Sequence, residues 1–236
     1  MPWYAKNTGG YPRTGPSAHA NALQIYYILS DRGWSLNAIA GVLGNLQFES
    51  GMNPWRWESD VMLNSSDPAI DYSTSNGYGL FQFTPPGKYL HSANARAIPG
   101  FRPNYANSAG DPFDGYTQVV FVDEYGDYVA TPQYPYSYSM YKVLALTPEE
   151  CADIWLANYE RGTPAANRRA WARFWYDELD GEPLIPPEFP PGYIANLPYG
   201  AIKAAVKRGG AIIENIPKRR MVGRAETRSR WQGKRN

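Results

Sequence analysis

One glutamate, Glu49, ends a segment whose apolar residues repeat with the period of a helix. Between Ile39 and Leu46 these residues recur three and four positions apart, which places them on one buried stripe. Glu49 follows Leu46 by three positions, so it lies at the edge of that stripe with its carboxylate directed at the protein. Partial burial there would favour the protonated carboxyl near neutral pH, as a general acid requires. The plainer alternative is a solvated or salt-bridged glutamate at a helix end.

The residues directly after Glu49 end this helix. Ser50, Gly51, Asn53 and Pro54 favour turns over helix and send the chain away sharply. We therefore expect Glu49 in the last turn of a core helix, half desolvated, on the lip of a cleft.

Capping residues mark the helices that must hold this segment. A first helix is expected from about Ser17 to Gly33, because a glycine suits a helix C-terminus. Ser35 caps the helix that carries Glu49. Residues 147–150, Thr-Pro-Glu-Glu, combine a capping box with proline at the first helical position, and they predict a helix that stops at Gly162.

The last predicted helix opens at Thr163-Pro164 in the same way and ends at Gly181. Its expected buried stripe consists of Trp171, Phe174, Trp175 and Leu179. Residues 53–83 indicate a small β-hairpin or irregular lobe, in which Gly77 and Gly79 let the backbone approach a ligand or a helix closely. Residues 86–146 are left open, since the pattern at 116–125 fits both strand and helix.

The fold class that follows is α+β, mainly α-helical, with one compact domain over residues 17–181. Residues 1–16 indicate an extended N-terminal arm, and residues 182–198 a proline-rich linker. The net charge of +1 conceals an asymmetry, because residues 1–198 carry −8 and residues 199–236 carry +9. The last stretch is therefore predicted to be a basic C-terminal arm with a role of its own.

Composition argues against several classes of function. The apolar runs fall far short of the ~20 residues of a membrane span, and the first ten residues lack the pattern of a secretory signal. Cys151 is the single cysteine and the two histidines are far apart, so we expect no disulfide framework, no metal site and no cofactor. The 19 Tyr and 8 Trp suit aromatic surfaces that bind sugars or proteins.

Three strings carry a resemblance to a known family. Residues 49–54, ESGMNP, resemble the catalytic signature of the lysozyme-like superfamily, which includes goose-type lysozymes and soluble lytic transglycosylases. Residues 79–82, GLFQ, resemble the second signature of those enzymes, and residues 155–162, WLANYERG, resemble a third. In this order the strings are most similar to the phage tail lysozyme family, over roughly residues 18–180.

The resemblance implies a lysozyme-like fold and roles for individual residues. Glu49 would be the catalytic acid, Tyr78 and Gln82 would form the cleft wall, and Tyr159 would be the aromatic of the third motif. Glu160 could support Glu49 or the substrate.

These binding residues also have plainer interpretations. Gln82 could cap backbone groups in a turn, Tyr159 could pack in the core, and Glu160 could form a surface ion pair with Arg161. Trp55 and Trp57 are candidates for stacking on sugars, although tryptophans after a helix end are usually packed.

Cleavage of a glycosidic bond needs a proton for the leaving oxygen and stabilisation of an oxocarbenium-like centre. A second carboxylate about 6.5–9.5 Å from the acid would activate water and give an inverting hydrolase. Asp60, Asp67 and Asp71 are the candidates, and we favour Asp71 because it adjoins the polar cluster 73–76. Without such a carboxylate, the substrate's own acetamido or 6-hydroxyl group would complete the reaction, which is the lytic transglycosylase route. Both routes act on the glycan strands of peptidoglycan.

The basic arm over residues 199–236 could bind nucleic acid, anionic wall polymers or other virion proteins, or it could be a disordered solubilising tail. We favour partners in a phage tail and rank nucleic acid last, because aromatic residues are not interleaved with its basic residues. The resulting prediction is a virion-associated peptidoglycan hydrolase that opens the host wall locally during genome delivery. The competing functions are a structural tail protein that binds glycan without cutting it and a free endolysin active at lysis.

Overall fold

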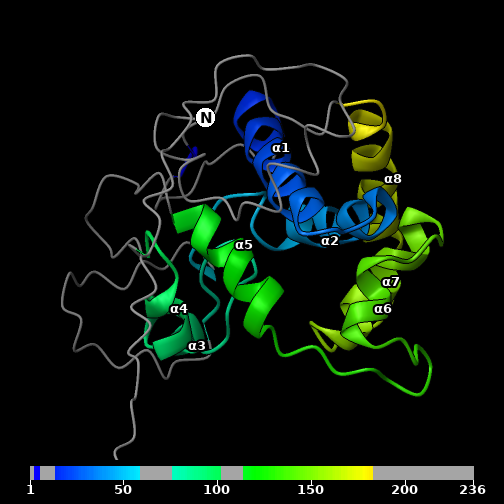
Figure 1. Ribbon diagram of the computed structural model, residues 1–236. Coiled ribbons are helices and arrows are strands. Elements are labelled where there is room, and N and C mark those ends of the chain that lie inside the picture. The colour runs from blue at the N-terminus through cyan, green and yellow to red at the C-terminus, as the bar shows by residue number, and fades with distance from the viewer. Residues whose placement is uncertain (1–2, 6–13, 59–75, 102–113, 183–236) are drawn as a thin grey trace, which may run out of the picture.

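The computed structural model describes residues 3–5, 14–58, 76–101 and 114–182, and their regular structure is helical (Figure 1). The helices are α1 (Pro16–Asp31), α2 (Leu36–Glu49), α3 (Gly87–Leu90), α4 (Ala93–Ala97), α5 (Asp114–Tyr125), α6 (Tyr138–Lys142), α7 (Pro148–Asn158) and α8 (Ala166–Leu179). Within these ranges, no helix is long and apolar enough to cross a membrane. The predicted mainly helical class is confirmed.

Helix α2 is the central element of the packing. It lies against α7 and α8 and also contacts α1 (Figure 1). Its predicted apolar stripe is buried, with Leu43 and Leu46 completely removed from solvent. The burial of this stripe fixes the direction in which the end of α2 presents its last residue.

Two glycines of α2 allow α7 and α8 to approach closely. A Cβ atom on Gly41 would lie 2.6 Å from the Cβ of Cys151 in α7. A Cβ atom on Gly44 would lie 2.6 Å from the carbonyl oxygen of Arg168 in α8. Since atoms cannot pack at such distances, any larger residue at either position would push a neighbouring helix away.

The predicted caps of α2 and α7 are confirmed. The Ser35 hydroxyl accepts a hydrogen bond from the Ala38 amide (3.2 Å). At α7, the Thr147 hydroxyl accepts from the Glu150 amide while the Glu150 carboxylate accepts from the Thr147 amide (2.9 Å), which completes the capping box. These short motifs fix where both helices begin.

The predictions for α8 were wrong in two respects. The helix begins at Ala166 with Ala165 at the N-cap and no side-chain cap, so Thr163-Pro164 does not open it. Phe174 is exposed and Trp171 only partly buried, and the buried residues of α8 are Arg168, Ala172, Trp175 and Leu179. The aromatic residues lie on more than one face of α8. The face that packs against α2 is the one with the small Ala172, because α8 approaches α2 closely at Gly44.

The segment between the helical motifs is less regular than a hairpin. In the described residues, its β structure consists of isolated bridges from Trp57 to Tyr78 and from Tyr78 to Phe83. The ambiguous stretch 116–125 is helical and belongs to α5. Residues 59–75, with Asp60, Asp67 and the favoured Asp71, lie outside the described residues.

Near the N-terminus, a short described segment packs onto the domain. The ring of Trp3 is buried against Gly115, and the Tyr4 amide donates to Asn21 Oδ1 (2.9 Å) in α1. This part of the predicted arm is therefore attached to the core. Residues 183–198 of the predicted linker and the basic arm lie outside the described residues.

Candidate active site

A cleft of about 730 Å³ opens beside the C-terminal end of α2. One wall comes from the ends of α2 and α7 and from the start of α8, and the other comes from α5 and the segment 81–88. Four of the sequence-predicted site residues line it, namely Glu49, Gln82, Tyr159 and Glu160. Residues far apart in the chain thus meet around one concave surface, the usual form of a ligand site.

Glu49 is the last residue of α2, and its side chain is about a quarter exposed (26%) at the cleft. The helix ends there because the amides of Ser50 and Gly51 both bond to the Leu46 carbonyl (2.9 and 3.0 Å). Gly51 adopts a left-handed backbone (φ 62°), and Asn53 Oδ1 then accepts from the Trp55 amide (3.0 Å). The Ser-Gly-Met-Asn residues form this turn, and the turn leaves Glu49 facing the cleft.

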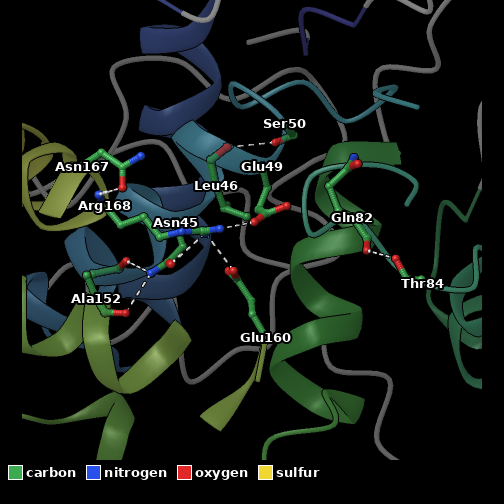
Figure 2. A network of polar contacts seen from close by, with 11 residues as sticks. Asn45, Leu46, Glu49, Ser50, Gln82, Thr84, Ala152, Glu160, Asn167 and Arg168 are labelled. Atoms are coloured by element: carbon green, nitrogen blue, oxygen red, sulfur yellow. Dashed lines mark hydrogen bonds and ion pairs between the residues drawn. The ribbon is translucent and has the colours of Figure 1, made fainter. Parts of the chain in front are cut away.

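Arg168 lies between two carboxylates. Its Nη2 donates to Glu49 Oε1, and its Nη1 donates to Glu160 Oε2 (2.8 Å) and to Asn45 Oδ1 (3.0 Å). Figure 2 shows these side chains converging from α2, α8 and the end of α7, with Gln82 on the other side of Glu49. The side chains of Arg168 and Glu160 are only 11% and 13% exposed, so water screens these interactions weakly.

The pKa of Glu160 is raised to about 8. Burial is the main cause, and the nearby negative charge of Glu49 adds to it, while the positive charge of Arg168 opposes both. One guanidinium is shared between two carboxylates in this buried site, so Glu160 keeps its proton at neutral pH. A carboxyl pair that holds a proton in a cleft is able to deliver it to a ligand.

Asn45 and Phe48 of α2 hold the guanidinium in place. The Asn45 amide donates to the carbonyl oxygens of Gly41 (2.9 Å) and Ala152 (3.0 Å), which leaves its oxygen directed at Arg168. The Phe48 ring lies 4.7 Å from Arg168 Cζ, within the range of a cation–π contact. Sequence reasoning missed Arg168, because its partner Glu49 is 119 residues away in the chain.

Helix α5 joins the loops that carry the glutamate and glutamine motifs. The buried Gln118 donates to the Pro54 carbonyl (2.7 Å) and accepts from the Leu80 amide (2.7 Å). A Cβ atom on Gly79 would lie 2.2 Å from Gln118 Oε1, so this contact requires glycine there. No local pattern points to Gln118, since its bond to Pro54 spans 64 residues.

Gln82 lies on the cleft wall with a left-handed backbone (φ 46°). Its side-chain nitrogen donates to the Gly79 carbonyl (2.8 Å) inside its own turn, which is the capping role considered above. Arg161, also in the cleft lining, has a positive φ of 59° as well. Strained backbone of this kind is concentrated at functional sites.

Tyr78 and Trp55, both expected to contact substrate, lie in the core instead. Tyr78 is completely buried, and its hydroxyl donates to Asp114 Oδ2 (2.8 Å). Its ring packs 4.7 Å from that of Trp57, and Trp55 is 5% exposed. None of the three lines the cleft, because all three side chains are buried in the core.

Aromatic residues that the sequence did not single out occur on the cleft surface. Phe48 in α2 and Tyr125 at the end of α5 are 44% and 43% exposed, and both line the cleft. Tyr159 also lines it and stacks on Trp155, with the ring centres 4.4 Å apart. Flat aromatic surfaces of this kind suit the apolar faces of sugar rings. No cluster of His, Cys, Asp and Glu suited to a metal ion occurs among the residues described.

Comparison with known proteins agrees with this geometry. The family model described as phage tail lysozyme matches residues 20–179. Morphogenesis protein 1 of Bacillus phage B103 is 30% identical over an alignment of 168 residues that covers 69% of this chain. The chain spans only 40% of the length of that relative. Because the family match covers most of the chain and includes all three motifs, this chain belongs to the phage tail lysozyme family.

Proposed function

We propose that this chain is a virion-associated peptidoglycan hydrolase of the muramidase type, with Glu49 as its general acid. Membership of the phage tail lysozyme family suggests a glycosidase that acts on the cell wall. The observation that carries the assignment of the acid is the position of Glu49 at a helix end, inside a cleft, next to the proton-holding Glu160.

In the proposed reaction, a proton passes from the Glu49 carboxyl to the glycosidic oxygen as that oxygen leaves the anomeric carbon. An oxocarbenium-like centre develops, and water then adds to the anomeric carbon and releases a proton. Asp71 is our candidate for the base that activates this water. If no carboxylate reaches, the 6-hydroxyl group of the substrate adds instead and leaves a 1,6-anhydro product.

The cleft supports a sugar polymer as the ligand. Phe48 and Tyr125 offer exposed rings for stacking, and Tyr159 and Gln82 extend the lining around Glu49. Glu58, Lys88 and Arg56 add polar and charged groups farther along the same surface. Stacking rings combined with a few polar groups are the usual means of orienting a carbohydrate.

The proposed place of action is the phage tail, during genome delivery. A relative that is named a morphogenesis protein fits a component of the particle. The basic residues 199–236 would attach the enzyme to other tail proteins, with residues 182–198 as a spacer.

Digestion of purified peptidoglycan tests the proposal. The wild-type protein and Glu49→Gln are compared, and the released muropeptides are weighed by mass spectrometry. We expect reducing-end products from the wild type and a loss of activity in the variant. Products with 1,6-anhydro ends would identify a lytic transglycosylase. An intact wall with both proteins over a range of pH and salt would favour a structural, glycan-binding role.

A further inference from the structure

We propose that Arg168 is a positioning residue that makes Glu49 and Glu160 act as one acid, so that the delivered proton is held by the pair rather than by Glu49 alone. This inference rests on the proposed glycosidase function and assigns the group that controls the protonation of its acid.

The geometry of Arg168 carries the inference. Each of its two terminal nitrogens contacts a different carboxylate, Nη2 that of Glu49 and Nη1 that of Glu160 (Figure 2). Asn45 accepts a third bond from Nη1, and Phe48 packs on the guanidinium, so the side chain is held from several directions. A planar guanidinium presents two terminal nitrogens to two carboxylates in a fixed geometry, whereas lysine has one ammonium nitrogen on a flexible stem.

The charges around Glu160 leave the pair one positive charge short. Glu49 faces it from α2, Arg168 from α8 and the neutral phenol of Tyr159 from the end of α7. Asp127, after α5, is engaged by Arg161 (3.1 Å). The remaining charged residues of the cleft lining are Arg56, Glu58 and Lys88. Within this described surrounding, the cation bonded to both carboxylates is Arg168, so keeping one proton makes the three-residue cluster neutral.

A bridging cation also keeps the ionised carboxylate paired, whichever of the two holds the proton. When the proton is on Glu160, the Glu49 carboxylate pairs with Arg168 Nη2, and when it is on Glu49, the Glu160 carboxylate pairs with Arg168 Nη1. The Glu49 carboxyl can therefore carry the proton when a glycosidic oxygen approaches. After the proton has moved to that oxygen, both carboxylates are ionised against one guanidinium. The base that activates the water passes the released proton to solvent, and the pair takes up one proton from solvent, so the cycle balances.

The pH dependence of peptidoglycan cleavage tests this coupling in the full chain. Wild type, Glu160→Gln and Arg168→Gln are compared, with Arg168→Lys as the conservative variant. Arg173→Gln is the matched control, because Arg173 in α8 also pairs with a carboxylate of α7, that of Glu149 (2.8 Å), outside the cleft.

We expect opposite shifts of the alkaline limb of the profile. In Glu160→Gln, Glu49 faces Arg168 without a competing carboxylate, so activity is lost at a pH lower by on the order of one to three units. In Arg168→Gln the limb moves to higher pH, because the cation that favours ionisation is gone. Arg168→Lys restores the position of the limb but not the full kcat. The control keeps the wild-type profile.

A limb that stays at the wild-type pH in Glu160→Gln, with only a uniform loss of rate, would overturn the proposal. A second measurement does not depend on activity. In protein labelled with carbon-13 at glutamate carboxyls, NMR titration should give a lower pH midpoint for Glu160 in Glu49→Gln than in wild type. An unchanged midpoint would also overturn the coupling, even if the wild-type protein cut no peptidoglycan.

Discussion

Two buried carboxylates in this protein, Asp123 and Glu160, differ in the number of cations that contact them. Asp123 in α5 accepts from the Trp34 indole (2.8 Å) and pairs with Arg32 (2.8 Å) and Lys142 (2.5 Å). Arg32 also pairs with the more exposed Glu124 (2.9 Å). Around Arg168, one cation serves two carboxylates, Glu49 and Glu160. The side chains of Asp123 and Glu160 are both largely buried, at 7% and 13% exposure, so burial alone does not separate them.

The difference in pKa follows from the number of cations. Burial by itself would raise the pKa of Asp123, but hydrogen bonds from Lys142, Trp34 and Arg32 outweigh it and lower the pKa. Glu160 has a share of one arginine and a carboxylate neighbour, so its pKa rises to about 8. Two cations bonded to one buried carboxylate favour its ionised form, and they join α1, α5 and α6. A deficit of cations gives a group that holds a proton at a cleft, which is the property a general acid needs.

The largest expected effect is on the rate of peptidoglycan cleavage, which should depend on the Arg168 cluster and not on the Asp123 cluster. Glu49→Gln should lower the rate of peptidoglycan cleavage by about 10²–10⁴-fold, because it removes the group that delivers the proton. Asp123→Asn should leave the rate per folded molecule near that of wild type. Muropeptide release at equal concentrations of folded protein measures both, and a similar loss in the two variants would contradict the distinction.

Substitution in the Asp123 cluster should lower the stability more than substitution in the Arg168 cluster, the reverse of the order expected for activity. Asp123→Asn leaves Lys142 without its carboxylate and Arg32 with only the more exposed Glu124, and the free energy of unfolding should fall by on the order of 3 kcal/mol. Glu160→Gln removes a carboxyl that is neutral in the folded protein but ionised in the unfolded chain at pH 7, so the free energy of unfolding should not fall. Denaturant unfolding at pH 7 provides both values. A loss in Glu160→Gln as large as that in Asp123→Asn would show that Glu160 is mainly structural.

Gly44→Ala should disturb the Arg168 cluster without changing any charge. The new Cβ would meet the Arg168 carbonyl oxygen at 2.6 Å and the Ala172 amide at 2.7 Å, so α8 must move. We expect a net loss of stability of about 1–3 kcal/mol, despite the better helix propensity of alanine, together with a loss of kcat. Gly41→Ala is the matched control, since it crowds α7 instead and should cost stability with a smaller loss of kcat.

The pH dependence of stability should have opposite signs for the two clusters. The folded-state pKa of Glu160 is raised, so its stabilising contribution is complete below the unfolded value near 4.5 and is lost as pH rises towards 8. The pKa of Asp123 is lowered, so its contribution is present above the unfolded value of 3.8 and is lost as pH falls below it. Unfolding at a series of pH values should show that Glu160→Gln gains stability relative to wild type between pH 4.5 and 8. A constant difference across that window would contradict the assignment.

The smallest expected effect concerns Tyr125, which lies on the same helix as Asp123 but faces the cleft. Tyr125→Ala should raise KM for soluble glycan fragments by about 2–10-fold with little change in kcat, because a stacking ring is lost. Phe174→Ala is the control, since Phe174 is similarly exposed (41%) on α8 but does not line the cleft. Equal effects in both variants would remove the reason to treat Tyr125 as a ligand contact.

Local sequence determined the parts of this protein that depend on neighbouring residues. Ser35 and the Thr147–Glu150 box fix the starts of α2 and α7 by bonding to backbone amides three residues away. The apolar repeat of α2 and the turn after Ser50 fix Glu49 at a buried helix end. Such features can be predicted from a sequence because the residues that interact are only a few positions apart in the chain.

Tertiary structure alone decided which groups accompany Glu49. The partner Arg168 lies 119 residues away, on a helix whose buried face was chosen by the fit of Ala172 against Gly44. Tyr78 has the residue type and spacing of a ligand contact, yet Asp114 holds it in the core. The proton on the Glu49–Glu160 pair depends on a count of charges gathered from α2, α7 and α8. No local sequence pattern shows this balance of charges, because the side chains interact strongly only after packing has removed the water between them.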